Sequence, residues 1–173
     1  MSDHEGVSER RLGVEPDRLS VTLRSADRDS IVAQARSEHP NECCGVLLGH
    51  RDRVERIQPT QNSLRSPVVF EVDPRELLDV LLAAEAASLD VLGYYHSHTS
   101  SPAYPSPTDV RYAAGWPDAV HLIVSLADAT PSLRAYSIQA SAESAAHAGG
   151  GEGGASLATR PAVGIRELEV LLR

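Results

Sequence analysis

The chain of 173 residues contains no lysine, so all 16 of its basic residues are arginines. No side chain of this protein can therefore be the acceptor of an isopeptide bond. Acidic residues number 24 and give a formal net charge of −8. Phosphate groups are bound by clustered cations, so this acidic balance argues against nucleic acid as a main partner.

Long hydrophobic runs are also missing. No stretch approaches 18 apolar residues, and the charged N-terminus has no apolar segment of the kind found in signal peptides. We therefore expect a soluble cytoplasmic protein without a membrane partner. The only two cysteines, Cys43 and Cys44, are adjacent and poorly placed for a disulfide, which favours a reducing compartment. Core packing is the favoured role for both, ahead of zinc ligation.

The distribution of residue types predicts one domain. Residues 1–18 are charged and unpatterned, and we expect a flexible N-terminal extension there. Residues 19–173 are long enough for a single domain with its own core. Within it, residues 140–159 are mainly alanine, serine and glycine, a composition typical of a flexible segment.

Hydrophobic patterning predicts a mixture of strands and helices. The predicted strands are 21–23, 43–48, 53–57, 68–72, 91–95, 120–126, 133–138 and 167–172. One helix should run from a cap at Asp27 or Asp29 to Glu38, and another from 106 or 108 to 114. A third, 75–88, should follow Pro74 and bury a stripe of Leu77, Leu78, Leu81, Leu82 and Glu85. Because strands and helices do not alternate regularly, an α+β fold is favoured over a doubly wound sheet.

Fourteen residues, 96–109, carry the clearest chemical signal. His96 and His98 are two apart, so on a strand both side chains point the same way. Asp109 follows eleven residues later, in the first turn of a predicted helix. Two imidazoles and a carboxylate suit a catalytic zinc ion that keeps a fourth position for water. Such a metal generates a nucleophile near neutral pH, so the pattern indicates a metal-dependent hydrolase.

A hydrolase of this type also needs a group that moves a proton. Glu42 is the best candidate, because it stands at the mouth of the predicted buried strand 43–48. Glu71 and Glu85 are alternatives. Trp116 is interpreted as a packing residue, and the remaining histidines as surface or structural residues: His4, His39, His50, His121 and His147.

Taken together, Glu42, His96-Ser97-His98, Ser106 and Asp109 resemble the signature of the JAMM (MPN+) metallopeptidases at every polar position. The similarity extends over about residues 20 to 140 and includes the segments 40–49 and 70–74. Thr99 departs from the pattern, since relatives often have proline there. The short chain resembles the bacterial branch of the family.

The resemblance implies a mixed, mostly antiparallel sheet flanked by helices, with a cytidine-deaminase-like architecture. It implies that His96, His98 and Asp109 bind one zinc ion. Glu42 would be general base and then general acid, and Ser106 would stabilise the oxyanion; Ser106 as only a helix cap is the plainer alternative. The implied partner is a ubiquitin-like sulfur-carrier protein ending in Gly-Gly, whose tail we expect to add to a strand edge beside the metal.

Other functions remain open at this point. An isopeptidase that removes ubiquitin-like proteins from lysines would carry the same residues. A non-catalytic MPN scaffold usually lacks metal ligands that this chain keeps, and the acidic charge disfavours a DNA-repair-associated relative. A zinc deaminase would need a Pro-Cys-x-x-Cys pair, which Cys43-Cys44 does not supply.

Overall fold

The part of the chain that the structure describes contains seven strands and three helices. The strands are β1 (Ser20–Leu23), β2 (Cys44–His50), β3 (Arg53–Thr60), β4 (Asp90–His98), β5 (Val120–Ser125), β6 (Ser132–Gln139) and β7 (Gly164–Leu172). The helices are α1 (Ser25–Glu38), α2 (Pro74–Ala86) and α3 (Pro107–Ala113). The computed structural model describes residues 18–139 and 164–173. The predicted flexible segments, 1–18 and 140–159, lie outside this part apart from Arg18.

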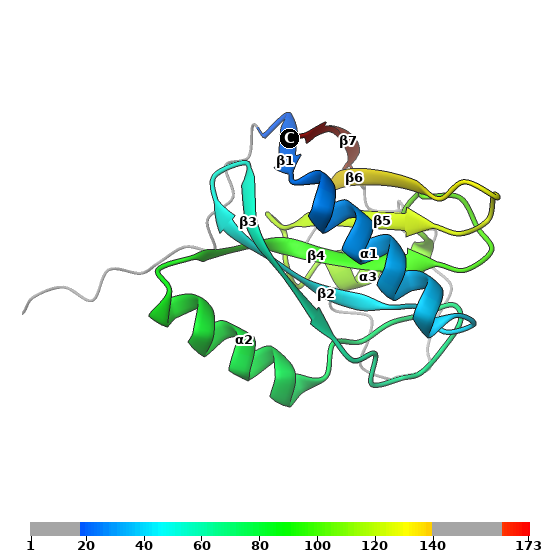
Figure 1. The fold of residues 1–173 in the computed structure, drawn as a ribbon, viewed down its shortest axis with the longest axis horizontal. Helices are drawn as coiled ribbons and strands as arrows, with labels where there is room; N and C mark the ends of the chain where they lie inside the picture. Colours follow the sequence, from blue (N-terminus) through cyan, green and yellow to red (C-terminus); the bar gives the residue numbers. More distant parts are fainter. Residues whose placement is uncertain (1–17, 140–163) are drawn as a thin grey trace, which may run out of the picture.

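The described strands close into one sheet in the order β1-β3-β2-β4-β5-β6-β7 (Figure 1). Four pairings are antiparallel and three are parallel, β1 with β3, β1 with β7, and β4 with β5. The α+β prediction with a mixed sheet is therefore confirmed. The likeness to cytidine deaminases stays a prediction.

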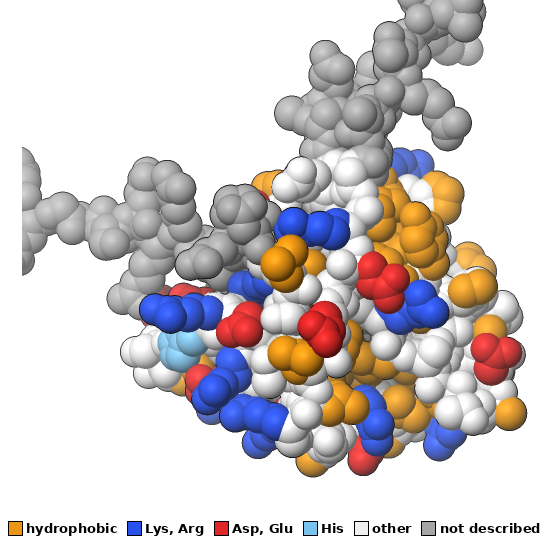
Figure 2. Space-filling view, turned by 90° about the horizontal axis from the view of Figure 1, so that it is seen from above, with side chains coloured by type: hydrophobic (Ala, Val, Ile, Leu, Met, Phe, Trp, Pro, Cys, Tyr) orange, Lys and Arg blue, Asp and Glu red, His pale blue; other side chains and the backbone are white. Residues whose placement is uncertain are grey.

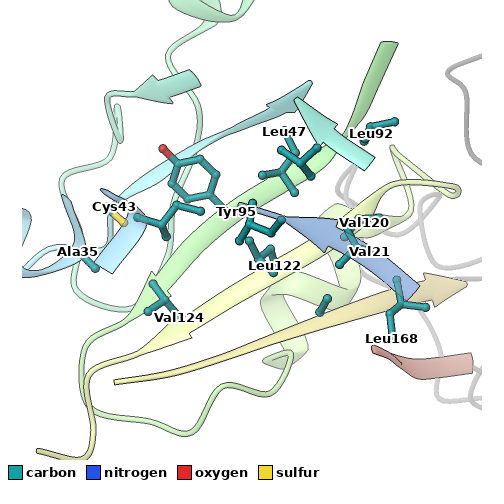
Figure 3. Close-up of a cluster of buried hydrophobic side chains, with 14 residues drawn as sticks. Val21, Ala35, Cys43, Leu47, Leu92, Tyr95, Val120, Leu122, Val124 and Leu168 are labelled. Carbon is teal, nitrogen blue, oxygen red and sulfur yellow. The ribbon is translucent and has the colours of Figure 1, made fainter. Parts of the chain in front are cut away.

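Helix α1 covers one face of the sheet (Figure 1). Ile31 and Ala35 of the helix belong to one buried cluster with Leu47, Tyr95 and Leu122 of three neighbouring strands (Figure 3). These side chains follow the alternation of the strands, so successive residues such as Tyr94 and Tyr95 face opposite sides. Burial of this cluster by the hydrophobic effect fixes which face of β4 points away from α1.

Helices α2 and α3 pack against the opposite face. Val80 and Ala84 of α2 join a cluster that includes Tyr94 of β4, and Ala113 of α3 joins another with Ile123 and Tyr136. His96 and His98 stand two and four residues after Tyr94 on the same strand, so their side chains also lie on this side of β4. The face between α2 and α3 is therefore where the candidate site forms.

Two local predictions are wrong for reasons visible in the structure. Residues 68–72 are not a strand, because they form only an isolated bridge between Asn62 and Val72, and Val68 is 73% exposed. Helix α1 begins at Ser25 without a side-chain cap, and Asp27 instead accepts two hydrogen bonds from Arg24.

The buried stripe of α2 is also shifted by part of a turn. Val80 and Ala84 are buried and Leu77 and Leu81 pack against them, whereas Leu78 and Leu82 are each 57% exposed; the predicted flanking residue Glu85 is exposed. The helix begins as predicted, with Pro74 in its first turn and Asp73 accepting from the backbone N–H groups of Arg75 and Glu76.

Cys43 and Cys44 are buried free thiols. Burial raises the pKa of the Cys43 thiol to about 12 and that of Cys44 to about 11, so both stay protonated at neutral pH. The prediction that they serve core packing is confirmed.

The outer surface shows no dominant charge on the face seen from above in Figure 2, where arginines, acids and apolar side chains are interspersed. Within the described ranges, none of the helices is both long and apolar enough to cross a membrane.

Candidate metal centre

Strand β4 presents the two histidines. It continues through His98, further than predicted, and both imidazoles are almost fully buried on the side of α2 and α3. Ser97 points the other way, where its hydroxyl accepts a hydrogen bond from the Cys43 N–H at 2.8 Å, while the Ser97 N–H donates to the Cys43 carbonyl. These two bonds extend the pairing of β2 with β4 beyond the Cys44–His96 pair and hold the end of β4 in place.

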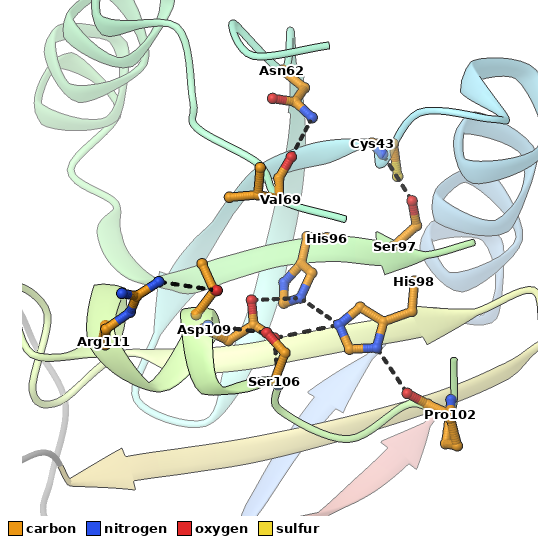
Figure 4. Close-up of polar contacts among 11 residues, drawn as sticks. Cys43, Asn62, Val69, His96, Ser97, His98, Pro102, Ser106, Asp109 and Arg111 are labelled. Atoms are coloured by element: carbon orange, nitrogen blue, oxygen red, sulfur yellow. Dashed lines mark hydrogen bonds and ion pairs between the residues drawn. The ribbon is translucent and has the colours of Figure 1, made fainter. Parts of the chain in front are cut away.

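Helix α3 presents the carboxylate. Ser106 is its N-cap, and the Ser106 hydroxyl accepts from the Asp109 N–H at 3.2 Å. The Asp109 carboxylate in turn accepts from the Ser106 N–H at 2.7 Å, which completes a capping box. The Pro-rich loop before the helix thus delivers Asp109 to the histidines with a fixed orientation (Figure 4).

The three side chains converge with spacings that suit a tetrahedral ion. His96 Nε2 and His98 Nε2 are 3.2 Å apart, and carboxylate oxygens of Asp109 lie 3.4 Å from the first and 3.3 Å from the second. Two ligands bound at about 2.0–2.1 Å around a tetrahedral zinc ion are separated by roughly 3.4 Å. Among the described residues, these three therefore form a group that fits such a metal.

The hydrogen bonds around His98 prepare it as a ligand. Its Nδ1 lies 2.8 Å from the Pro102 carbonyl oxygen, which can only accept, so Nδ1 carries a proton and Nε2 is the ring nitrogen left to bind a metal ion. Burial lowers the pKa of His98, but hydrogen bonds with Asp109 and Pro102 outweigh it and leave the pKa raised. Burial likewise opposes ionisation of Asp109, yet hydrogen bonds with both histidines hold its pKa well below the usual range.

Glu42 lies beside this group, two residues before β2. Its N–H donates to the Ser66 carbonyl and its own carbonyl accepts from the Asn62 side chain, so its backbone is fixed on both sides. The side chain is 4% exposed. Burial raises its pKa to about 7, while the charge of His98 lowers it and that of Asp109 raises it. A carboxyl group that titrates near neutral pH can both accept and return a proton.

The loop between β3 and α2 covers His96. Phe70 stacks on the imidazole of His96, with ring centroids 4.3 Å apart and planes inclined by 19°. Asn62 holds this loop: its side-chain oxygen accepts from the N–H groups of Leu64 and Glu71, and its amide donates to the carbonyls of Glu42 and Val69. One side chain thus ties the loop to the backbone of Glu42.

A pocket of about 260 Å³ opens next to the metal centre. Its lining comes from the β3–α2 loop, α2, α3 and the sheet: Phe70, Glu71, Val72, Pro74, Leu77, Tyr94, Asp109, Tyr112, Trp116 and His121. Burial lowers the pKa of His121 to about 4, with His96 lowering it further and Asp109 raising it, so the ring is neutral. Three buried polar atoms, Tyr94 Oη, His96 Nδ1 and His121 Nε2, find no hydrogen-bond partner within the described residues.

The structure thus brings together His96, His98, Asp109 and Glu42, with Ser106 directly attached to Asp109. The other acids considered for proton transfer, Glu71 and Glu85, are exposed. His121 was interpreted as a surface or structural residue; it is 6% exposed and lines the pocket. A single histidine within the otherwise apolar run 120–124 was the signal that could have identified it.

Comparisons with known proteins identify relatives of this chain. The chain is 45% identical over 121 residues to a CysO-cysteine peptidase of Mycobacterium tuberculosis, a match that covers 68% of this chain and 82% of the relative. It is 42% identical over 112 residues to a desampylase of Haloferax volcanii, covering 61% and 80%. A solved solution structure, protein DSY2949 of Desulfitobacterium hafniense, is similar with a TM-score of 0.69 and 31% identity over 88% of this chain and 92% of that one. The family model for prokaryotic homologs of the JAB domain matches residues 25–139, and the chain belongs to this family.

Proposed function

We propose that this protein is a zinc-dependent peptidase that hydrolyses the bond after the C-terminal Gly-Gly of a ubiquitin-like sulfur-carrier protein. It would release cysteine from a carrier adduct or trim the carrier tail. The observation that carries the proposal is the 3.2–3.4 Å spacing of the ligand atoms of His96, His98 and Asp109.

The proposed roles follow from the surroundings of each residue. His96, His98 and Asp109 would hold one zinc ion per chain, which lowers the pKa of water and polarises a carbonyl group. Glu42 would take up the proton of the attacking water and pass it to the leaving amine. Ser106 would donate its hydroxyl hydrogen to the developing oxyanion, since its oxygen already accepts from Asp109 N–H and its hydrogen remains available.

The similarity to a CysO-cysteine peptidase supports a carrier with cysteine at its end as the substrate. A tail of two glycines is the expected recognition sequence, because a substrate backbone close to the metal leaves no room for a Cβ atom. β1 pairs with β3 only at Arg53, so the rest of this edge of β3 has no strand partner among the described residues. An extended substrate tail could add to this edge, and the loop between β3 and α2 and the pocket would contact its side chains.

A second candidate is isopeptidase activity on conjugates of such carriers, which the similarity to a desampylase favours. We keep it as the alternative because the same residues would serve both reactions. A single domain over 19–173 and a cytoplasmic location also stay predictions, as does the absence of nucleic acid partners.

The test combines metal content with product analysis. Purified protein should contain one zinc per chain and should cleave a carrier fused to a single cysteine directly after Gly-Gly, as measured by mass spectrometry. His98→Ala should lose both zinc and activity, because only two of the three protein ligands remain. His50→Ala is the matched control, since His50 lies on the surface and pairs with Asp90. Equal zinc content in wild type and His98→Ala would contradict the ligand assignment.

A further inference from the structure

The pocket beside the metal centre has walls and a floor of different chemistry. Its walls are mainly apolar and include the rings of Phe70 and Trp116 and the side chain of Leu77. Its floor lies on the sheet, where Tyr94 of β4 and His121 of β5 stand directly opposite each other. A volume of about 260 Å³ falls below the range of about 300–1,000 Å³ typical for drug-sized ligands, so one side chain is a suitable guest.

The floor offers hydrogen bonds that nothing in the described structure uses. Tyr94 and His121 are each only 6% exposed, yet Tyr94 Oη and His121 Nε2 have no partner among the described residues. A buried polar group without a partner costs free energy, and an aliphatic guest would leave both atoms unsatisfied. A guest with a polar tip would satisfy them.

The pocket is continuous with the site of cleavage. Asp109 belongs to the metal centre and also lines the pocket, and Phe70 both stacks on His96 and forms a wall. A peptide whose scissile bond lies at the metal centre therefore has residues within reach of the pocket. The most direct occupant is a side chain of that same peptide.

We propose that this pocket binds one side chain of the substrate peptide, that it selects a flat apolar body with a neutral hydrogen-bonding tip, and that Tyr94 and His121 bind the tip. Tyrosine matches this description best. The ring would lie between apolar walls, and its hydroxyl can donate to one floor atom and accept from the other. Charged tips fit less well, because an ion buried against apolar walls loses more hydration than a hydroxyl does.

This inference rests on the proposed peptidase function, and the first experiment uses it. Carrier fusions are prepared in pairs with Tyr or Phe at one position, either among the four residues before Gly-Gly or directly after it. A site built to bind a hydroxyl rejects the analogue that lacks it. We expect kcat/KM to favour Tyr over Phe by at least about tenfold at one position. Equal values at every position would overturn the proposal and mean that water alone fills the floor.

Variants of Tyr94 and His121 test whether these two residues cause the preference for Tyr over Phe in the substrate. Tyr94→Phe and His121→Leu should each bring the Tyr/Phe ratio close to one, whereas His121→Gln, which keeps a hydrogen-bonding tip, should retain part of it. Tyr95→Phe is the matched control, because its hydroxyl hydrogen-bonds to Gln34 on the opposite face of the sheet. The Tyr/Phe ratio should be the same in this control as in wild type. A ratio that falls equally in all four variants would indicate a general packing effect and contradict the assignment.

A binding measurement separates this proposal from the proposed function. Trp116 is the only tryptophan of the chain, lies in the pocket wall and contacts the edge of the Tyr94 ring at 5.0 Å between centroids. Its fluorescence therefore reports on the pocket without any reaction. Short tail peptides with Tyr should change this emission at concentrations at least about tenfold below those with Phe. If this holds while no fusion is cleaved, the pocket assignment stands and the peptidase function fails. If the two peptides titrate alike, the pocket assignment fails whatever the fusions show.

Discussion

Glu42 combines deep burial with a pKa near the pH of the cell, which is the property that a proton-transferring carboxylate needs. Glu42→Gln keeps the shape of the side chain but cannot take up a proton. We expect the variant to retain zinc and to lose kcat by about 10²-fold or more. Glu85→Gln on the exposed side of α2 is the control and should keep normal turnover. Substantial activity in Glu42→Gln would mean that a group other than Glu42 transfers the proton.

The same residue predicts a pH-dependent stability in the metal-free protein. Burial raises the pKa of Glu42 from 4.5 to about 7, so the folded state holds this proton more tightly than the unfolded chain. The stabilisation is fully present below about pH 4.5 and is lost as the pH rises through 7. Wild type should therefore be less stable than Glu42→Gln by up to about 3 kcal/mol at pH 8, and the difference should vanish near pH 4.5. Denaturant unfolding of both proteins at the two pH values measures this.

Ser106 has an established place as the cap of α3, and its proposed oxyanion contact is an additional role. Loss of the cap alone costs about 1 kcal/mol, whereas loss of an oxyanion donor lowers kcat about 10²- to 10³-fold. We expect Ser106→Ala to show both effects, with zinc content nearly unchanged. Asp73→Ala removes the cap of α2 and should show the stability loss without the kinetic one. Normal turnover in Ser106→Ala would restrict Ser106 to capping.

At the scale of elements, the loop between β3 and α2 was the hardest part to predict. The apolar residues of 68–72 suggested a strand, but the Asn62 side chain takes up backbone groups that a strand would pair with another strand. Such side chain to backbone bonds join residues far apart in sequence and leave no periodic pattern. The strand that carries His96 and His98 was predictable, because the continuous apolar run 91–95 leads directly to the two histidines.

The prediction of which α2 residues are buried was wrong for a related reason. Four leucines stand on neighbouring positions of the helix, and composition alone does not say which of them face the sheet. Val80 and Ala84 are buried because their smaller side chains allow close approach to β2 and β4. Asp109, in contrast, was predicted in the first turn of its helix, and Ser106 was one of the two predicted caps, since a serine followed three residues later by an acid is a local capping signal.

Asn62 gives a prediction at this scale. Asn62→Ala would leave the N–H groups of Leu64 and Glu71 and the carbonyls of Glu42 and Val69 without their present partners. Three of these four hydrogen bonds are only partly buried, so each contributes about 0.5–1.5 kcal/mol, and we expect a loss of a few kcal/mol in stability or local opening of the loop. Hydrogen exchange should show faster exchange at 63–72, and activity should fall because Phe70 and Glu42 lose their support. Unchanged exchange in this segment would mean that the loop is held by other contacts.

For the whole molecule, the proposed function requires a small active site to recognise a folded carrier protein. The pocket is sized for one side chain, so contacts with a tail alone bury little surface. Binding energy from parts of the substrate far from the reacting bond can support the transition state, and a truncated substrate then loses kcat as well as affinity. We expect the isolated tail peptide to be cleaved at least about 10²-fold less efficiently than the complete carrier fused to cysteine.

The carrier in which Gly-Gly is replaced by Ala-Ala is the complementary substrate, because it keeps the folded body and adds two Cβ atoms at the metal. It should bind with similar affinity and be cleaved poorly, since the added atoms act at the reacting bond and not at the remote surface. Measuring kcat and KM for the three substrates separates recognition of the body from recognition of the tail. If all three are cleaved at equal rates, the protein recognises neither, and its activity is that of a general metallopeptidase.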